Sequence, residues 1–327
     1  MAVYTEISDE ELHSFIARYT VGEVISCKGI AEGVQNSNFL LVTDSGPYIL
    51  TLYEKGTSTP DLPFFLALLE HLASKGLACP LPVRARNGET LQSLSGRPAA
   101  LVTFLKGMWP RRIVPAHCAG VGEALARLHQ AGQDFPGSRP NNLSLAGWRS
   151  LYEATAAQAN SVSPGLATLL AEELATLEGA WPTDLPRGII HADLFPDNVF
   201  FSGDKLSGLI DFYFACTDFL AYDIAVCLNA WCFEPDRSFN TTKARLLLSN
   251  YQRIRPLNEA ELAFLPLLAR GASVRFLMTR LFDWLNHPPG ALVTPKDPLE
   301  YLAKLRFHQN VHGLTDYCLD ATFDAAL

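Results

Sequence analysis

His191-Ala192-Asp193-Leu194-Phe195-Pro196-Asp197-Asn198 is the stretch that decides the fold, together with Ile210-Asp211-Phe212 a short distance downstream. An Asp, an Asn five residues later and a second Asp ending an apolar strand suit in-line phosphoryl transfer from magnesium-bound ATP. The chemistry needs one carboxylate, Asp193, at the attacking hydroxyl. It also needs oxygen ligands for the metal, which Asn198 and Asp211 can supply.

The residues between the two motifs read as a β-hairpin. Segments 198–201 and 206–210 are rich in strand-forming residues, and Ser202-Gly203-Asp204-Lys205 is a typical turn sequence. A hairpin brings its two ends together, and therefore Asn198 and Asp211. Taken alone, Asp193 also fits a turn aspartate that caps the following segment. The ordered set of His191, Asp193, Asn198 and Asp211 favours catalysis over that alternative.

Length and composition restrict the class of protein. A chain of 327 residues with 48% hydrophobic residues predicts two lobes rather than one core. A net charge of −8, with no basic run longer than Arg111-Arg112, predicts no nucleic-acid partner. The acidic N-terminus does not resemble a signal peptide, and we expect no apolar stretch of membrane-spanning length. Seven cysteines without a CxxC pattern predict reduced thiols and a cytoplasmic, membrane-free protein.

Strand-forming runs dominate the first part of the chain. Residues 1–104 are predicted to form a small lobe, an antiparallel sheet plus helix that binds nucleotide. Its elements are a capped helix after Ser8, strands at 21–27, 38–43 and 48–53, a helix at 62–75, and strands at 90–94 and 98–104.

Helical periodicity dominates from residue 105 to residue 327, which predicts a larger, mostly helical lobe carrying the catalytic and metal loops. The predicted helices lie at 115–131, 145–160, 164–181, 220–233, 241–254, 259–285 and 298–319. The fold class is therefore α+β.

A glycine-bearing loop joins the first two strands of the small lobe. Gly29, Gly33, Asn36, Ser37 and Asn38 could let backbone amides approach phosphate groups. The alternative is a simple hairpin connection, which is the commoner role of such a loop.

The central motifs resemble those of a known family. His-x-Asp-x-x-x-x-Asn followed by Ile-Asp-Phe resembles the catalytic and metal loops of protein kinases, but Ala192 stands in place of the kinase arginine. No Ala-Pro-Glu segment follows. The sequence is similar instead to the aminoglycoside phosphotransferase and choline kinase branch, in which Leu125-Ala126-Arg127-Leu128-His129 has a counterpart. Segments 48–54, 188–198, 208–216, 222–225 and 229–232 narrow the resemblance to phosphotransferase-like homoserine kinases, over essentially the whole chain.

This resemblance implies a bilobal protein-kinase-like (aminoglycoside phosphotransferase-like) fold that uses ATP and Mg²⁺ to phosphorylate L-homoserine for threonine synthesis. It implies that Asp193 is the base, that His191 and Asp223 orient the catalytic loop, and that Thr103, Phe104 and Leu105 bind adenine. Other acceptors in the same fold, such as choline, an aminoglycoside or methylthioribose, stay open as alternatives. A nucleotide-binding protein without transfer activity is a further one.

One departure from the kinase pattern concerns the phosphate-binding lysine. The third strand reads Tyr48-Ile49-Leu50-Thr51-Leu52, with Thr51 or Leu52 where the lysine belongs. The following helix has Phe64 and Phe65 near the position of the Glu that usually pairs with this lysine, so both members of the ion pair are missing. Loop amides near Gly29 and Gly33, or the cations Lys28, Lys55 and Arg111, could take over this task. The residues do not distinguish these alternatives.

A zwitterionic acceptor needs a carboxylate for its ammonium group and a guanidinium for its carboxyl group. The candidates lie on the helices after the metal loop: Asp218, Asn229, Arg237, Arg275 and Arg280. For each one the alternative is a solvated helix face or an internal ion pair. We expect a monomer or a homodimer.

Overall fold

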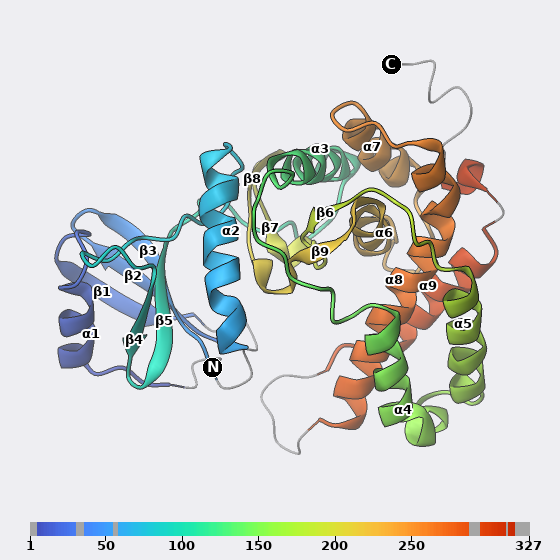
Figure 1. Cartoon of the computed structure of the whole chain (residues 1–327), viewed down its shortest axis with the longest axis horizontal. Coiled ribbons are helices and arrows are strands. Elements are labelled where there is room, and N and C mark those ends of the chain that lie inside the picture. The colour runs from blue at the N-terminus through green and yellow to red at the C-terminus, as the bar shows by residue number, and fades with distance from the viewer. Residues whose placement is uncertain (1–4, 31–35, 55–57, 288–294, 312, 318–327) are drawn as a thin grey trace. The chain divides into compact units, whose positions relative to one another are not determined.

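The computed structural model describes residues 5–30, 36–54, 58–287, 295–311 and 313–317, and the chain forms two compact units (Figure 1). The first comprises Met1–Gly107 and Ser207–Tyr213, and the second comprises Met108–Leu206 and Phe214–Leu327. The division lies close to the predicted boundary at residue 104, but Ser207–Tyr213 was predicted to belong to the larger lobe. It groups with the first unit because Leu209 N donates to Ala78 O at 2.9 Å and Gly208 packs against Leu105.

The first unit is built on one antiparallel sheet with strand order β1-β2-β3-β5-β4. Its helices and strands match the predicted ones with small shifts at their ends: α1 (Asp9–Ile16), β1 (Val24–Gly29), β2 (Ser37–Thr43), β3 (Gly46–Leu52), α2 (Leu62–Ser74), β4 (Leu91–Leu94) and β5 (Arg97–Thr103). A 3₁₀ turn at Thr59–Asp61, which was not predicted, precedes α2. The predicted capping box at the start of α1 is present, since Ser8 and Glu11 exchange side-chain and backbone hydrogen bonds.

Helices α1 and α2 cover opposite faces of this sheet. Phe15 of α1 packs in one apolar cluster with Leu50 and Leu101, whereas Phe65 of α2 packs in another with Ala100. Successive residues of a strand point to opposite faces, so the neighbours Ala100 and Leu101 mark the two sides.

The second unit is mostly helical, as Figure 1 shows. Its elements are α3 (Pro115–Ala131), α4 (Leu145–Val162), α5 (Leu166–Ala180), β6 (Arg187–Ile190), β7 (Val199–Ser202), β8 (Lys205–Leu209, continuing into the first unit), β9 (Cys216–Phe219), α6 (Leu220–Trp231), α7 (Thr241–Gln252), α8 (Glu259–Leu285) and α9 (Leu299–Gln309), with 3₁₀ turns at Pro196–Asn198, Phe212–Phe214 and Leu314–Tyr317. The last helix was predicted to reach residue 319 but ends earlier, at the C-cap Asn310.

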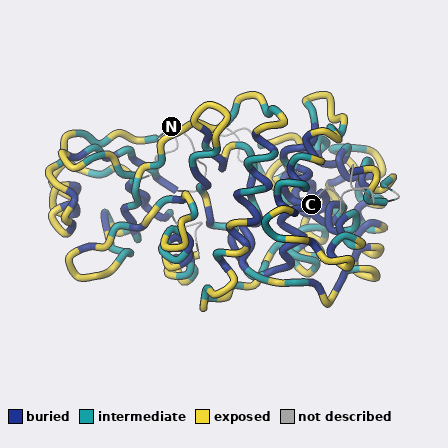
Figure 2. Tube along the Cα trace, turned by 90° about the horizontal axis from the view of Figure 1, so that it is seen from above, coloured by how far each residue is buried: buried dark blue, intermediate teal, exposed yellow. Residues whose placement is uncertain are grey.

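Helix α8 is the central helix of the second unit and contacts α4, α6 and α9. By length and composition alone it is apolar enough to cross a membrane, which the sequence analysis did not expect. Its apolar character has another physical reason, because 61% of its most apolar window is buried within the protein. Figure 2 shows that buried residues gather on inner segments of the trace and exposed ones on outer loops.

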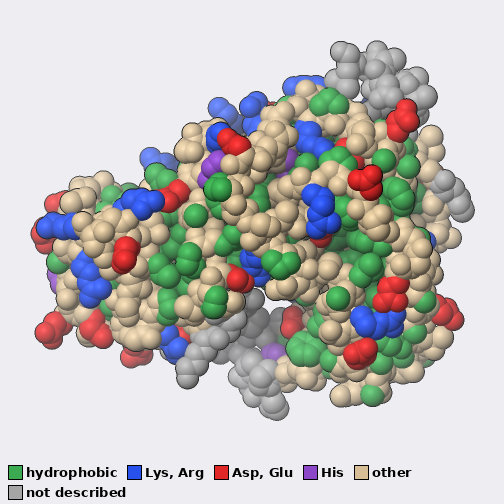
Figure 3. All heavy atoms as spheres, in the orientation of Figure 1, with side chains coloured by type: hydrophobic (Ala, Val, Ile, Leu, Met, Phe, Trp, Pro, Cys, Tyr) green, Lys and Arg blue, Asp and Glu red, His purple; other side chains and the backbone are tan. Residues whose placement is uncertain are grey.

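Acidic and basic side chains are interspersed on the face shown in Figure 3, and no continuous basic area is visible among its described residues.

Candidate active site

The loop after β6 is held by the carboxylate of Asp223, which lies on α6 and is fully buried. The backbone amides of His191 and Ala192 donate to its Oδ2 and Oδ1 atoms, at N···O distances of 2.7 and 2.8 Å. Asp193 N in turn donates to His191 Nδ1 at 3.3 Å. Ala192 has a positive φ of 63°, in the region that disfavours side chains. Asp223 therefore stabilises a turn that the local sequence does not prefer.

His129 of α3 completes this hydrogen-bond network. Its Nε2 atom lies 3.2 Å from Asp223 Oδ2, and its Nδ1 atom lies 2.7 Å from the hydroxyl of Tyr251. Burial lowers the pKa of His129 against the opposing effect of Asp223, so the ring is neutral, donates from Nε2 and accepts at Nδ1. The segment that ends in His129 was noted in the sequence, but its role in the site was missed.

The pKa of Asp223 reflects the same contacts. Burial alone would raise this pKa, yet the hydrogen bonds that Asp223 accepts from the His129 ring and from the His191 backbone N–H lower it below its ordinary value. Asp223 is therefore an ionised acceptor.

Asp193 and Asn198 lie side by side. Asn198 Nδ2 donates to the backbone oxygen of Asp193 at 2.8 Å and to its carboxylate Oδ2 at 3.3 Å. Burial raises the pKa of Asp193 to about 6, against the opposing positive charge of Arg275. A carboxyl group with such a pKa accepts a proton from a hydroxyl better than an ordinary Asp does near neutral pH.

The β7-β8 pair is the predicted hairpin. Asn198 ends the 3₁₀ turn directly before β7, and Asp211 follows β8 with a positive φ of 63°. The amide nitrogen of Asn198 is committed to Asp193, so its oxygen is the atom that a metal would take. An amide oxygen and a carboxylate fit Mg²⁺, which ordinarily completes its coordination with water and substrate phosphates.

A model of the phosphotransferase enzyme family matches residues 26–257 of the sequence. The chain belongs to this family. It is 65% identical to the homoserine kinase of Bradyrhizobium diazoefficiens over 98% of both chains. It is 63% identical to that of Rhodospirillum rubrum over 98% of this chain and 99% of the relative.

Solved structures of phosphotransferases share the fold. The choline kinase of Cryptosporidium parvum matches 98% of this chain and 97% of its own, with a TM-score of 0.67 at 14% identity. An amicoumacin kinase in complex with AMP-PNP and Ca²⁺ matches 92% of both chains, with a TM-score of 0.66. The predicted α+β, aminoglycoside phosphotransferase-like fold is thereby confirmed, and ATP is the phosphate donor that the family implies.

Two residues predicted to bind the acceptor of the phosphotransferase have internal partners instead. Asn229 is fully buried, and its amide binds the backbone oxygens of Ala225 and Ala269 and the hydroxyl of Ser273. Asp218 accepts from the amide of Asn141 at 2.8 Å and from the next backbone N–H. These contacts satisfy the polar groups of both residues without a substrate. Because Asn229 is also fully buried, we withdraw its assignment to the acceptor site.

The three predicted arginines differ from one another. Arg237 is exposed and lies 3.4 Å from the Asp297 carboxylate. Arg280 is buried, donates to Glu300 Oε2 at 2.7 Å and lies over the ring of Tyr301 at 4.5 Å. Arg275 is buried against the catalytic loop, where its Nη1 atom donates to the backbone oxygen of Ala192.

The predicted nucleotide-binding residues lie in the first unit. Gly29 ends β1, Asn36 Oδ1 accepts from Glu54 N at 3.2 Å, and the Ser37 hydroxyl donates to Glu54 Oε1 at 2.7 Å. Asn38 Oδ1 accepts from the Thr51 hydroxyl at 2.7 Å, so Thr51, one of the two residues predicted to fall where the kinase lysine belongs, ties β3 to the start of β2. Gly33 and the candidate cation Lys55 lie outside the described residues.

Thr103 ends β5, and its hydroxyl accepts from Leu81 N at 2.9 Å. Phe104 is exposed and Leu105 is half-buried. Lys28 and Arg111, the other candidate phosphate-binding cations, are both exposed, and no contact distinguishes them.

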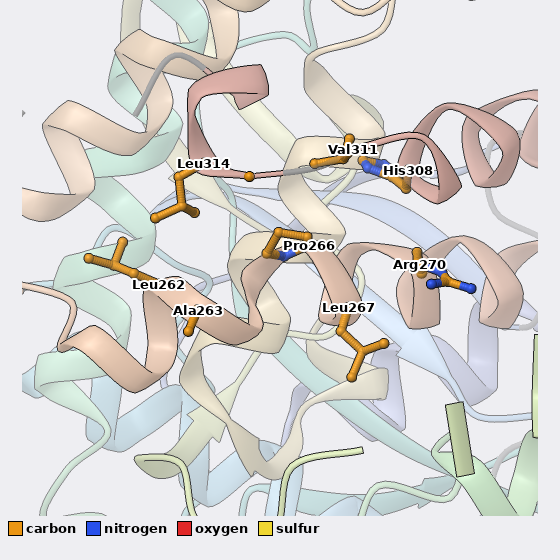
Figure 4. A pocket seen from close by; sticks show the side chains of 9 residues that line it. Leu262, Ala263, Pro266, Leu267, Arg270, His308, Val311 and Leu314 are labelled. Carbon is orange, nitrogen blue, oxygen red and sulfur yellow. The ribbon is translucent and has the colours of Figure 1, made fainter. Parts of the chain in front are cut away.

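The pocket in Figure 4 is distinct from the candidate active site. It has a volume of about 340 Å³ and is lined mainly by apolar residues of α8 and of the segment after α9. None of the predicted site residues lines it.

Proposed function

We propose that the protein transfers the γ-phosphate of ATP to the side-chain hydroxyl of L-homoserine and so forms O-phospho-L-homoserine for threonine biosynthesis. The observation that carries this proposal is the identity of 65% and 63% to two homoserine kinases over nearly the whole chain. The proposal also agrees with the match to the phosphotransferase enzyme family and with the contact between Asp193 and Asn198.

Asp193 takes the proton of the substrate hydroxyl as the new O–P bond forms and the bond between the γ-phosphorus and the bridging oxygen of ATP breaks, with ADP as the leaving group. Asp223 and His191 hold the loop that carries Asp193. Asn198 and Asp211 are the proposed ligands of Mg²⁺. When bound, this ion neutralises the charge that develops on the phosphate oxygens.

The nucleotide is proposed to bind to the small lobe, residues 1–104. The proposed phosphate-binding residues are Gly29, Gly33, Asn36, Ser37 and Asn38, and the Thr103-Phe104-Leu105 segment is proposed to offer backbone groups to adenine. The larger lobe, residues 105–327, carries the catalytic and metal loops. The hydrogen bonds of Asn36, Ser37 and Asn38 support this assignment, because they fix the end of the loop that enters β2.

L-homoserine is the proposed small-molecule partner, with Asp218, Arg237 and Arg280 left as candidates for its charged groups. We further propose a cytoplasmic monomer or homodimer that binds neither nucleic acid nor membrane. A net charge of −8 supports the absence of a nucleic-acid partner.

A coupled assay of ADP release with purified protein and Mg²⁺-ATP tests the function. We expect turnover with L-homoserine well above the rate without acceptor. Choline, methylthioribose and an aminoglycoside are the comparison acceptors, because solved relatives of this fold include a choline kinase and a spectinomycin phosphotransferase. Turnover with one of these and none with homoserine would replace the proposed substrate. ATP binding without turnover on any acceptor would indicate a non-catalytic protein, against which the Asp193-Asn198 pair argues.

A further inference from the structure

Arg275 of α8 is placed against the peptide that precedes Asp193. Only 2% of the residue is exposed, and its Nη1 atom donates to the backbone oxygen of Ala192. Its guanidinium carbon lies 4.5 Å from the ring centre of Phe276 and 5.6 Å from that of Phe214. The charge is therefore enclosed by the aromatic rings and by the catalytic loop.

The other two arginines of the same helix, of which Arg270 is half-buried and Arg280 buried, are neutralised differently. Arg270 is paired with Glu173 at 2.7 Å, and Arg280 is paired with Glu300 at 2.7 Å. Among the described residues, Arg275 has no carboxylate within ion-pair distance. A buried charge without an opposite charge beside it is costly, so the presence of Arg275 here calls for a reason beyond packing.

Arg275 acts on the residue directly before Asp193. The same guanidinium fixes the carbonyl of Ala192, whose N–H group is bound to Asp223. Both polar groups of Ala192 are thus held by buried side chains of opposite charge, one from α6 and one from α8.

We propose that Arg275 is a positioning residue, which fixes the Ala192 carbonyl and so sets the orientation of the Asp193 carboxylate. This assignment rests on the proposed role of Asp193 as the base, and it replaces the sequence-based assignment of Arg275 to the substrate. The burial of the guanidinium and the commitment of Nη1 to the backbone argue against direct contact with a soluble acceptor.

The test uses Arg275→Met and Arg275→Lys, with Arg270→Met as the matched control on the same helix. We expect Arg275→Met to lower kcat roughly 10- to 100-fold, since a small misplacement of a reacting group has effects of this size. KM for homoserine and for ATP should change less than about twofold, because no substrate contact is lost. Arg275→Lys keeps the charge and should lose less, and Arg270→Met should lower thermal stability with kcat nearly unchanged.

A double variant separates positioning from a general structural role. If Arg275 acts through Asp193, then Arg275→Met should reduce the residual rate of Asp193→Asn less than about threefold. An unreduced 10- to 100-fold loss in that background would overturn the proposal, as would a rise in KM for homoserine at constant kcat. If Arg275→Met does not fold, Arg275→Lys carries the same comparison. If the wild-type protein turns over another acceptor, the proposed substrate fails, and the kcat ratios measured with that acceptor still decide the role of Arg275.

Discussion

Replacing Asp223 with Asn changes the charge of the residue that holds the catalytic loop while keeping its shape. In the wild-type protein Oδ2 accepts from His191 N and from His129 Nε2, and Oδ1 accepts from Ala192 N. We expect the Asn oxygen to take the Oδ2 position, because that placement keeps two of the three hydrogen bonds. The new NH₂ group then faces the N–H of Ala192, which loses its acceptor.

The magnitude follows from this exchange. A hydrogen bond to a charged group contributes about 1.5–3 kcal/mol, and a buried donor left without an acceptor adds a further penalty. We expect Asp223→Asn to lower the free energy of unfolding by about 2–4 kcal/mol. Since the freed amide precedes Asp193, kcat should also fall, by roughly 10- to 100-fold.

Urea denaturation followed by fluorescence, with the ADP-release assay on the same samples, measures both effects. Glu173→Gln is the control, because it also weakens a buried ionic contact, that with Arg270 at 2.7 Å, but not one to the catalytic loop. It should lose stability while keeping kcat. A loss of less than about 1 kcal/mol in Asp223→Asn, with kcat unchanged, would refute the reasoning.

Three further predictions concern single residues. Asp193→Asn should lower kcat roughly 10²- to 10⁴-fold and leave ATP affinity, measured by calorimetry, within about twofold. Burial lowers the pKa of His308 to about 3, so the unfolded chain takes up the proton first and the stability of the protein falls as pH drops below about 6.5. Between pH 7 and pH 5, His308→Gln should therefore lose about 2 kcal/mol less stability than wild type in urea titrations. Parallel pH curves for the two proteins would contradict this. A Cβ atom at Gly122 would lie 2.0 Å from Leu247 O, whereas one at Gly120 would meet only ordinary contacts at 3.6 Å. Gly122→Ala should therefore destabilise the protein by about 1–3 kcal/mol in thermal melts, and Gly120→Ala should not. Equal melting temperatures of the two variants would count against the close packing.

The parts of the structure that could be predicted are those specified by nearby residues. The Ser8 capping box, the helix at Pro115–Ala131 and the β7-β8 hairpin each depend on a short pattern of caps, apolar periodicity or turn residues. The order of Asp193, Asn198 and Asp211 likewise lies within one hairpin and its flanks.

The parts that could not be predicted depend on pairs far apart in the chain. His129 and Asp223 are separated by 94 residues, and Arg275 and Ala192 by 83. Arg275 and Arg270 both lie among apolar residues of α8, so no local pattern in the sequence distinguishes the arginine that contacts the loop after β6 from the arginine in an ordinary ion pair. Asn229 failed as a substrate residue for the same reason, since its partners lie on other turns and helices.

The catalytic loop illustrates how charge can stabilise a strained backbone. A left-handed Ala costs about 1–2 kcal/mol, and such strain persists only where the surroundings impose it. At Ala192 a carboxylate binds the N–H group and a guanidinium binds the carbonyl, so the two charges act on opposite ends of one residue. Each charge is compensated in part by the backbone dipole it holds, which explains why Arg275 is retained without a carboxylate partner. Because β3 provides no lysine for the phosphates, we infer that the proposed base and the proposed metal ligands carry more of the catalysis, and a loop fixed from both sides meets that need.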